Sequence, residues 1–145
     1  MTVKEYLRQL WCMDRTIDIK YRELEKLRAE IGIRQMPDNA DRVTGSGYPQ
    51  DHVADTVIQI LQLQEKLNEA LGRYIELKQK ITEQIDGMEN QAYKDILTCR
   101  YVLMMTWEDV AATMKYDRRY CFKIHGRALQ VFYDQYLKED TERHS

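Results

Sequence analysis

The chain has little glycine, proline or cysteine and no long hydrophobic run. Only six glycines and two prolines occur among its 145 residues, which disfavours a fold of strands and tight turns. No apolar run approaches the roughly 18 residues that a membrane span requires, and the first 30 residues alternate charged with apolar side chains. The sequence therefore predicts a helical protein of the cytoplasm, without a signal peptide or a membrane segment.

Residues that could carry chemistry are few and scattered. The three cysteines, Cys12, Cys99 and Cys121, lie far apart and form no metal-binding spacing, so we expect reduced, buried thiols. The histidines are isolated, and His125 is interpreted as a hydrogen-bonded residue at the surface or its boundary. No pairing of a nucleophile with a base and no nucleotide-binding loop can be named. We therefore predict a protein that is not an enzyme, with no catalytic residue, cofactor or metal.

Positive charge is concentrated in one segment of a mildly acidic chain. The formal net charge is −2, from 22 basic and 24 acidic residues. Residues 91–127 alone hold 7 basic and 4 acidic side chains, a local balance of +3. A basic segment of this kind is the electrostatic footprint expected of a surface that contacts nucleic acid.

Two long amphipathic helices are predicted in the first part of the chain. Apolar residues recur at alternating spacings of three and four from Val3 to Ile31, the pattern of a helix with one buried seam. A second such helix runs from about Asp51 to Met88, with one broad apolar face formed by Val57, Ile60, Leu61, Leu63, Leu67, Leu71, Tyr74, Leu77, Ile81 and Ile85. Prolines and glycines between them predict a loop at residues 32–50. Together these features predict a coiled-coil-like antiparallel hairpin over residues 1–89, which favours a homodimer.

Shorter helices are predicted over residues 90–137, followed by a charged tail at residues 138–145. Asn90 is expected to cap a helix that reaches about Leu103. Thr106, followed by an acid three residues later, is expected to cap a helix that buries Trp107, Val110, Ala111 and Met114. Lys115 and Tyr116 then form a turn, and Asp117 caps a last helix whose apolar side comprises Cys121, Ile124, Ala128, Leu129 and Phe132.

The last two of these helices predict a helix-turn-helix. Small Ala111 lets the two helices approach closely, and the short turn forces a sharp angle between them. The first turns of the second helix reach base edges when such a helix lies in a major groove. Arg118 and Arg119 can form bidentate hydrogen bonds to guanine, and Tyr120 offers a ring and a hydroxyl. Contacts to phosphates are expected from Lys115, Lys123 and Arg127.

These residues also carry a family resemblance. The stretches at 106–114, 117–124 and 127–129 resemble region 4 of sigma factors. The whole layout, with the segments at 97–101 and 42–46, is similar to small phage-encoded transcriptional regulators of the ArpU and RinA type from Gram-positive hosts. In region 4 the residues after the turn read promoter bases, a role that the resemblance transfers to Arg118, Arg119, Tyr120 and Lys123. Two positions depart from the pattern: Phe122 replaces a frequent basic residue, and Lys115 replaces the usual turn glycine.

The resemblance implies a DNA-binding regulator of late phage or prophage genes that is able to contact host RNA polymerase. The residues and the resemblance together favour an all-α, sequence-specific regulator that binds double-stranded DNA as a homodimer. Two alternatives stay open. A phage packaging protein similar to a small terminase subunit also joins a helix-turn-helix to coiled helices, although there the DNA-binding end usually comes first. A helical protein–protein interaction module would use the hairpin as its working surface.

Overall fold

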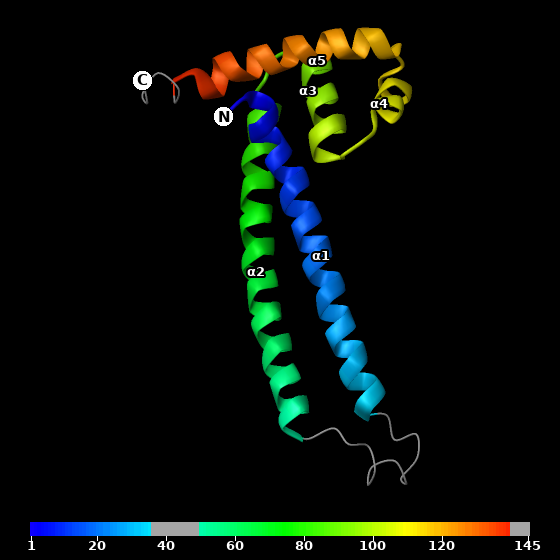
Figure 1. Cartoon of the computed structure of the whole chain (residues 1–145). Helices are drawn as coiled ribbons and strands as arrows, with labels where there is room; N and C mark the ends of the chain where they lie inside the picture. The colour runs from blue at the N-terminus through cyan, green and yellow to red at the C-terminus, as the bar shows by residue number, and fades with distance from the viewer. Residues whose placement is uncertain (36–49, 140–145) are drawn as a thin grey trace. The chain divides into compact units, whose positions relative to one another are not determined.

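The protein is all-α, as predicted. The computed structural model describes residues 1–35 and 50–139, and these residues form helices and no strand. Five α-helices follow one another along the chain, namely α1 (Val3–Gln35), α2 (Gln50–Asp86), α3 (Gln91–Leu97), α4 (Trp107–Met114) and α5 (Arg118–Phe132) (Figure 1). Two π-helical turns, η2 (Thr98–Val102) and η3 (Tyr133–Leu137), extend α3 and α5.

The chain divides into two compact units. One comprises residues 14–73, and the other combines Met1–Met13 with the chain from Tyr74 onward. The predicted boundary at residue 89 stays a prediction, as does the function assigned to each part. The resemblance at 42–46 and most of the predicted loop at 32–50 lie outside the described residues, as does the tail beyond residue 139.

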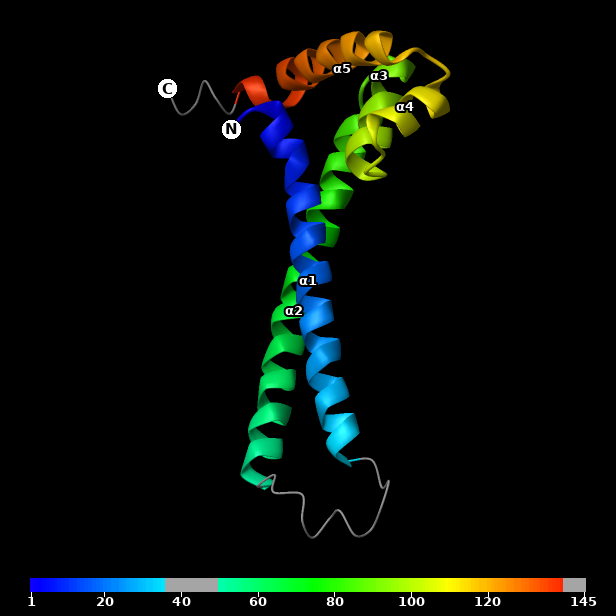
Figure 2. The same ribbon diagram turned by 45° about the vertical axis from the view of Figure 1, so that its right-hand side comes forward.

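In the unit of residues 14–73, the later part of α1 and the earlier part of α2 run side by side in opposite directions (Figures 1 and 2). Leu24, Leu63 and Leu67 are buried between these helices, and Ile17, Leu27 and Ile60 pack around them. Burying an apolar side chain of this size stabilises the folded state by about 1.5–3 kcal/mol, so three such leucines hold the pair together.

The single broad apolar face predicted for α2 is confirmed only in part. Leu63 and Leu67 are buried, but Val57, Leu61 and Leu71 are exposed. The sequence showed apolar residues on neighbouring rows of the helix, and periodicity alone does not tell which row meets a partner. In this unit α2 therefore carries two apolar stripes, and only one of them contacts α1.

The other unit has one continuous core that joins residues distant in sequence. Leu7 and Leu10 from the start of α1 are buried there together with Ile81 and Ile85 from the end of α2. Met88, the π-helical turn η2 and helices α3, α4 and α5 supply the rest of this core, and α5 packs against α3 and α4. The sequence did not predict that the first turns of α1 would join the core formed by the short C-terminal helices.

Local hydrogen bonds explain where the helices begin. The side chain of Asn90 accepts a hydrogen bond from the backbone N–H of Tyr93, which confirms the predicted cap of α3. A reciprocal capping box that the sequence reading missed starts α1. There the Thr2 hydroxyl accepts from the N–H of Glu5, and the Glu5 carboxylate accepts from the N–H of Thr2.

The cysteines follow the prediction in part. Cys99 and Cys121 are buried, and burial raises the pKa of both thiols, so both stay protonated and unreactive. Cys12 is exposed, contrary to the prediction, because it lies outside the apolar seam of α1.

Candidate nucleic-acid interface

Helix α4 is fixed by its cap and by one fully buried side chain. The Thr106 hydroxyl accepts a hydrogen bond from the backbone N–H of Asp109 at 3.2 Å, as the sequence predicted. Val110 is buried, and the other three residues of the predicted apolar face are partly buried against the same core. The carboxylates of Glu108 and Asp109 in the first turn stabilise the helix, because they lie near the positive end of its dipole.

Lys115 ends α4 in a left-handed conformation, with φ of 60° and ψ of 37°. Its backbone N–H donates to the carbonyl of Ala111, and so does the N–H of Tyr116. The chain then reverses through residues 115–117 into α5, which is the turn length of a helix-turn-helix. A Cβ atom makes the left-handed conformation unfavourable by about 1–2 kcal/mol, so the replacement of the usual turn glycine carries a cost.

Replacing Lys115 with glycine is expected to raise the free energy of unfolding by up to about 1 kcal/mol. The gain is smaller than the full strain because glycine also loses more backbone entropy on folding. Urea denaturation followed by circular dichroism measures the change. Lys115→Ala is the matched control, since it removes the same charged side chain but keeps the Cβ atom. Equal stability of the glycine and alanine variants would show that the turn is not strained.

Helix α5 is anchored on one side and exposed on the other. The side chain of Asp117 accepts a hydrogen bond from the N–H of Tyr120 at 2.7 Å, which confirms the predicted cap. Of the five residues predicted for its apolar side, Leu129 is partly buried and the other four are buried, namely Cys121, Ile124, Ala128 and Phe132. Phe132 packs against Tyr6 and Tyr136, with ring centroids 5.9 and 5.0 Å apart.

All six residues predicted to contact DNA are exposed, namely Lys115, Arg118, Arg119, Tyr120, Lys123 and Arg127. Arg119, Lys123 and Arg127 follow one another at spacings of four and lie on one stripe of α5. Arg118 lies at the edge of this stripe, and its guanidinium sits 5.9 Å from the Phe122 ring centroid. The Tyr120 ring packs edge-on against Tyr116 at 4.9 Å, which limits its freedom. The structure thus brings these side chains to the outer side of one helix and the turn before it.

His125 differs from the sequence interpretation, because it is buried rather than at the surface. Its Nε2 lies 2.7 Å from the Tyr101 hydroxyl, and its ring meets the edge of Trp107 at 4.8 Å. Burial, together with the smaller effect of the positive charges of Lys4, Arg100 and Arg8, lowers the pKa of His125 to about 4. The imidazole is therefore neutral at neutral pH and can accept a hydrogen bond from the tyrosine hydroxyl.

Arg100 is held between two indole rings. Its guanidinium carbon lies 4.8 Å from the Trp11 ring centroid and 4.7 Å from that of Trp107. One guanidinium nitrogen also donates to the Met105 carbonyl at 2.7 Å. Cation–π contacts are worth about 0.5–2 kcal/mol each, so these three interactions fix the position of the charge. The sequence reading did not select Arg100 as a functional residue.

Arg100 also lines a pocket of about 320 Å³ with two further cations, Lys4 and Arg8 from α1. His125 and Gly126 of α5 form the opposite part of its lining, with Phe122 and Leu129 beside them. No acidic residue lines this pocket, and none within the described ranges forms an ion pair with its three cations. The sequence signal was available, since Lys4 and Arg8 are four residues apart on one helical face. Only the tertiary structure shows that this face borders α5.

A family model described as "Protein of unknown function (DUF1492)" matches residues 36–132, which is more than half of the chain. The chain belongs to this DUF1492 family. The match includes α2 through α5 and therefore the whole exposed stripe of α5. No curated protein and no solved structure matches this DUF1492 protein. Across residues 1–35 and 50–139, no helix has the length and apolar character for crossing a membrane. The same residues hold no group of three or more potential metal ligands.

Proposed function

We propose that this DUF1492 protein is a sequence-specific DNA-binding regulator of transcription. The observation that carries the proposal is the exposed basic stripe on α5, which follows a capped two-turn helix and a three-residue turn. The buried side of α5 fixes its position, so the outer side chains are presented on a rigid element. A rigid helix with cationic first turns fits the major groove in width and in charge.

The exposed residues divide by their chemistry. Arg118 and Arg119 lie in the first turn of α5 and are proposed to read guanine through bidentate hydrogen bonds. Tyr120 supplies an additional contact to a thymine methyl group or a phosphate. Lys115 in the turn, with Lys123 and Arg127 further along α5, is proposed to neutralise phosphates, which positions the helix without specifying bases.

The cationic pocket extends the proposed phosphate contacts beyond α5. Lys4, Arg8 and Arg100 carry three like charges without an acidic partner in the described residues, an arrangement that favours the binding of an anion. Arg100 is pre-positioned by its two tryptophans, so it loses little conformational freedom on binding. A backbone phosphate beside the groove that α5 occupies would supply the missing negative charge.

The resemblance to ArpU- and RinA-type regulators adds a biological role to the proposal. We infer that the protein controls late genes of a phage or prophage, acts in the cytoplasm as a homodimer and contacts host RNA polymerase. Two copies would engage two half-sites, as two-fold DNA-binding proteins do.

Selection from a randomised pool of DNA duplexes tests the proposed function. The purified full chain is expected to enrich one motif, and its affinity for that motif should fall steeply with salt. Each phosphate contact contributes about 0.9 to the slope of log affinity against log salt, so five to six cationic contacts predict a slope of roughly −5. Fluorescence anisotropy at several salt concentrations gives the slope.

The absence of any enriched motif, with only weak and salt-sensitive binding, would overturn the proposal. That outcome would favour the protein–protein interaction module, with the helical hairpin as its working surface. Light scattering on the same sample distinguishes the packaging alternative, because a large ring-shaped oligomer is typical of small terminase subunits and a dimer is not.

A further inference from the structure

Helix α2 carries an exposed stripe with the spacing of a second buried seam. Val57, Leu61 and Leu71 are exposed on it, and Ile75 is the next residue at the same spacing along the helix. Gln64 and Asn68 occupy the two central positions. The six residues follow alternating steps of four and three, which is the heptad spacing of a helix that packs against another helix. Exposed apolar residues in this order are unusual for a helix face that stays in water.

The exposed stripe lies beside the stripe that contacts α1. The exposed stripe is offset by one residue from the stripe that contacts α1. Its members Leu61, Gln64 and Asn68 directly follow Ile60, Leu63 and Leu67 of the contacting stripe. One residue is about 100° of rotation around an α-helix, so the two stripes face in roughly perpendicular directions. Helices of four-helix bundles have this property, because each of them meets two neighbours. The pair formed by α1 and α2 in residues 14–73 therefore resembles half of such a bundle.

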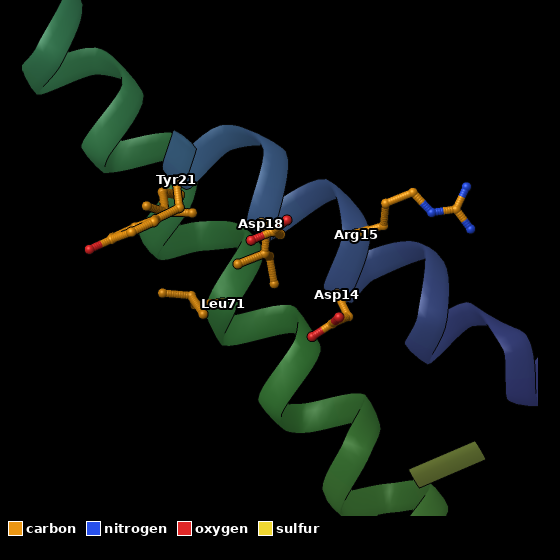
Figure 3. Close-up of a pocket in the computed structure, with 7 residues that line it drawn as sticks. Asp14, Arg15, Asp18, Tyr21 and Leu71 are labelled. Atoms are coloured by element: carbon orange, nitrogen blue, oxygen red, sulfur yellow. The ribbon is translucent and has the colours of Figure 1, made fainter. Parts of the chain in front are cut away.

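A groove next to the stripe supplies a place for an incoming apolar side chain. It is a cavity of about 470 Å³ between α1 and α2, lined among others by Ile17, Tyr21, Leu67 and Leu71. Tyr21 and Leu71 lie on the same side of the helix pair, whereas Arg15 points away from them (Figure 3). Tyr21 is itself exposed, so the exposed apolar surface continues from α2 onto α1.

The stripe is complementary to itself when two copies run in opposite directions. A two-fold axis level with Lys66 pairs residues that lie equally far from it along the helix. Leu61 then meets Leu71 of the second copy, and by the same spacing Val57 meets Ile75. Gln64 meets Asn68, so apolar residues face apolar ones and amides face amides. A two-fold interface between identical copies has this property. If a residue of one copy contacts a second residue of the other copy, then the second residue of the first copy contacts the first residue of the other.

We propose that two copies of this chain associate through this stripe of α2, antiparallel and centred on Lys66, to complete a four-helix bundle. The Gln64 and Asn68 amides hydrogen-bond to each other across the axis and fix the register, as polar residues in apolar seams do. Leu61 of each copy packs beside Tyr21 in the groove of the other. This inference deepens the homodimer of the proposed function but needs no DNA.

The dimensions of the stripe fit a stable dimer. From Val57 to Ile75 it is about 28 Å long, and a pair of helices is about 20 Å wide. These dimensions give on the order of 550 Å² for each copy and about 1,100 Å² in total, above the roughly 1,000 Å² of a specific interface. A different protein could also cover an apolar stripe, but it would not require the two-fold order of residues that this stripe has.

Sedimentation equilibrium of the full chain without DNA tests the proposal. The unchanged protein is expected to be a dimer, and Leu61→Lys is expected to raise the dimer dissociation constant by about a hundredfold or more, because it places a charge in the seam twice. Ile19→Lys is the matched control, since Ile19 is 57% exposed and Leu61 is 59% exposed, but Ile19 does not line the groove. A monomeric unchanged protein, or equal effects of the two substitutions, would overturn the proposal.

Two further variants test the orientation. Leu61→Lys mixed with Leu71→Glu should form a heterodimer, because lysine then faces glutamate at one pairing and leucine faces leucine at the other. Mixing Gln64→Cys with Asn68→Cys should give a disulfide between positions 64 and 68 under oxidising conditions, identified by mass spectrometry of peptides. Predominant 64–64 and 68–68 disulfides would mean a parallel dimer and would overturn the antiparallel arrangement. These outcomes do not depend on DNA binding, so each proposal can fail without the other.

Discussion

Replacement of both Arg118 and Arg119 with alanine is expected to abolish sequence-specific DNA binding while leaving the helical content unchanged. Both side chains are exposed in the first turn of α5, and neither belongs to the core. A bidentate contact between arginine and guanine discriminates against the wrong base by about 1–3 kcal/mol, so the loss of two lowers specific affinity by about a hundredfold or more. Fluorescence anisotropy with the selected duplex measures the affinity, and circular dichroism measures the helix content.

A matched variant separates base reading from simple loss of charge. Lys4→Ala combined with Arg8→Ala also removes two positive charges from the proposed interface, but from the pocket rather than from α5. It should weaken binding to all duplexes by a similar factor and reduce the salt slope by about 2. If the Arg118 and Arg119 variant keeps the preference for the selected motif, then the first turn of α5 does not read bases.

Acidification is expected to destabilise the protein between about pH 6.5 and pH 4 through His125. In the unfolded chain this imidazole becomes charged near its ordinary pKa of 6.5, whereas in the folded protein its pKa is about 4. Between these values the unfolded state binds more protons, so stability is complete above pH 6.5 and is lost as the pH falls. The difference corresponds to about 3 kcal/mol, as an order of magnitude, because one pKa unit is worth about 1.4 kcal/mol.

The cause of this sensitivity is the surroundings of the imidazole. His125 is only 6% exposed, and the charged groups that lower its pKa are Lys4, Arg100 and Arg8, all of them positive. Urea denaturation at a series of pH values measures the effect. His125→Gln should remove most of the slope between pH 6.5 and 4. An unchanged slope in His125→Gln would assign the acid sensitivity to carboxylates elsewhere.

Sequence reasoning succeeded where local chemistry decides the structure. The caps at Asn90, Thr106 and Asp117 were predicted correctly because a short polar side chain satisfies nearby backbone N–H groups whatever the rest of the fold does. The buried side of α5 was predicted because its apolar residues recur with the helical period. The turn at Lys115 and Tyr116 was predicted, and the structure adds that Lys115 is left-handed there.

Prediction from the sequence failed where the position of a residue depends on contacts with a distant segment of the chain. The burial of His125 depends on Tyr101, Trp107 and the beginning of α1, and none of these contacts leaves a trace in the local pattern. The helix predicted from Asn90 to Leu103 is interrupted by the π-helical turn η2, which shifts the following side chains around the axis. Arg100 lies in this turn, so its place between two tryptophans could not be derived from helical spacing.

The split origin of one core has a consequence for how the protein is made. Residues 14–73 form a unit from one uninterrupted stretch, so this part can fold as soon as it leaves the ribosome. The first turns of α1 are translated well before α5, yet Leu7 and Leu10 pack with side chains as late as Phe132. This core therefore cannot close until α5 has been translated. Such non-local contacts slow folding, because a long stretch of chain must be brought together before they form.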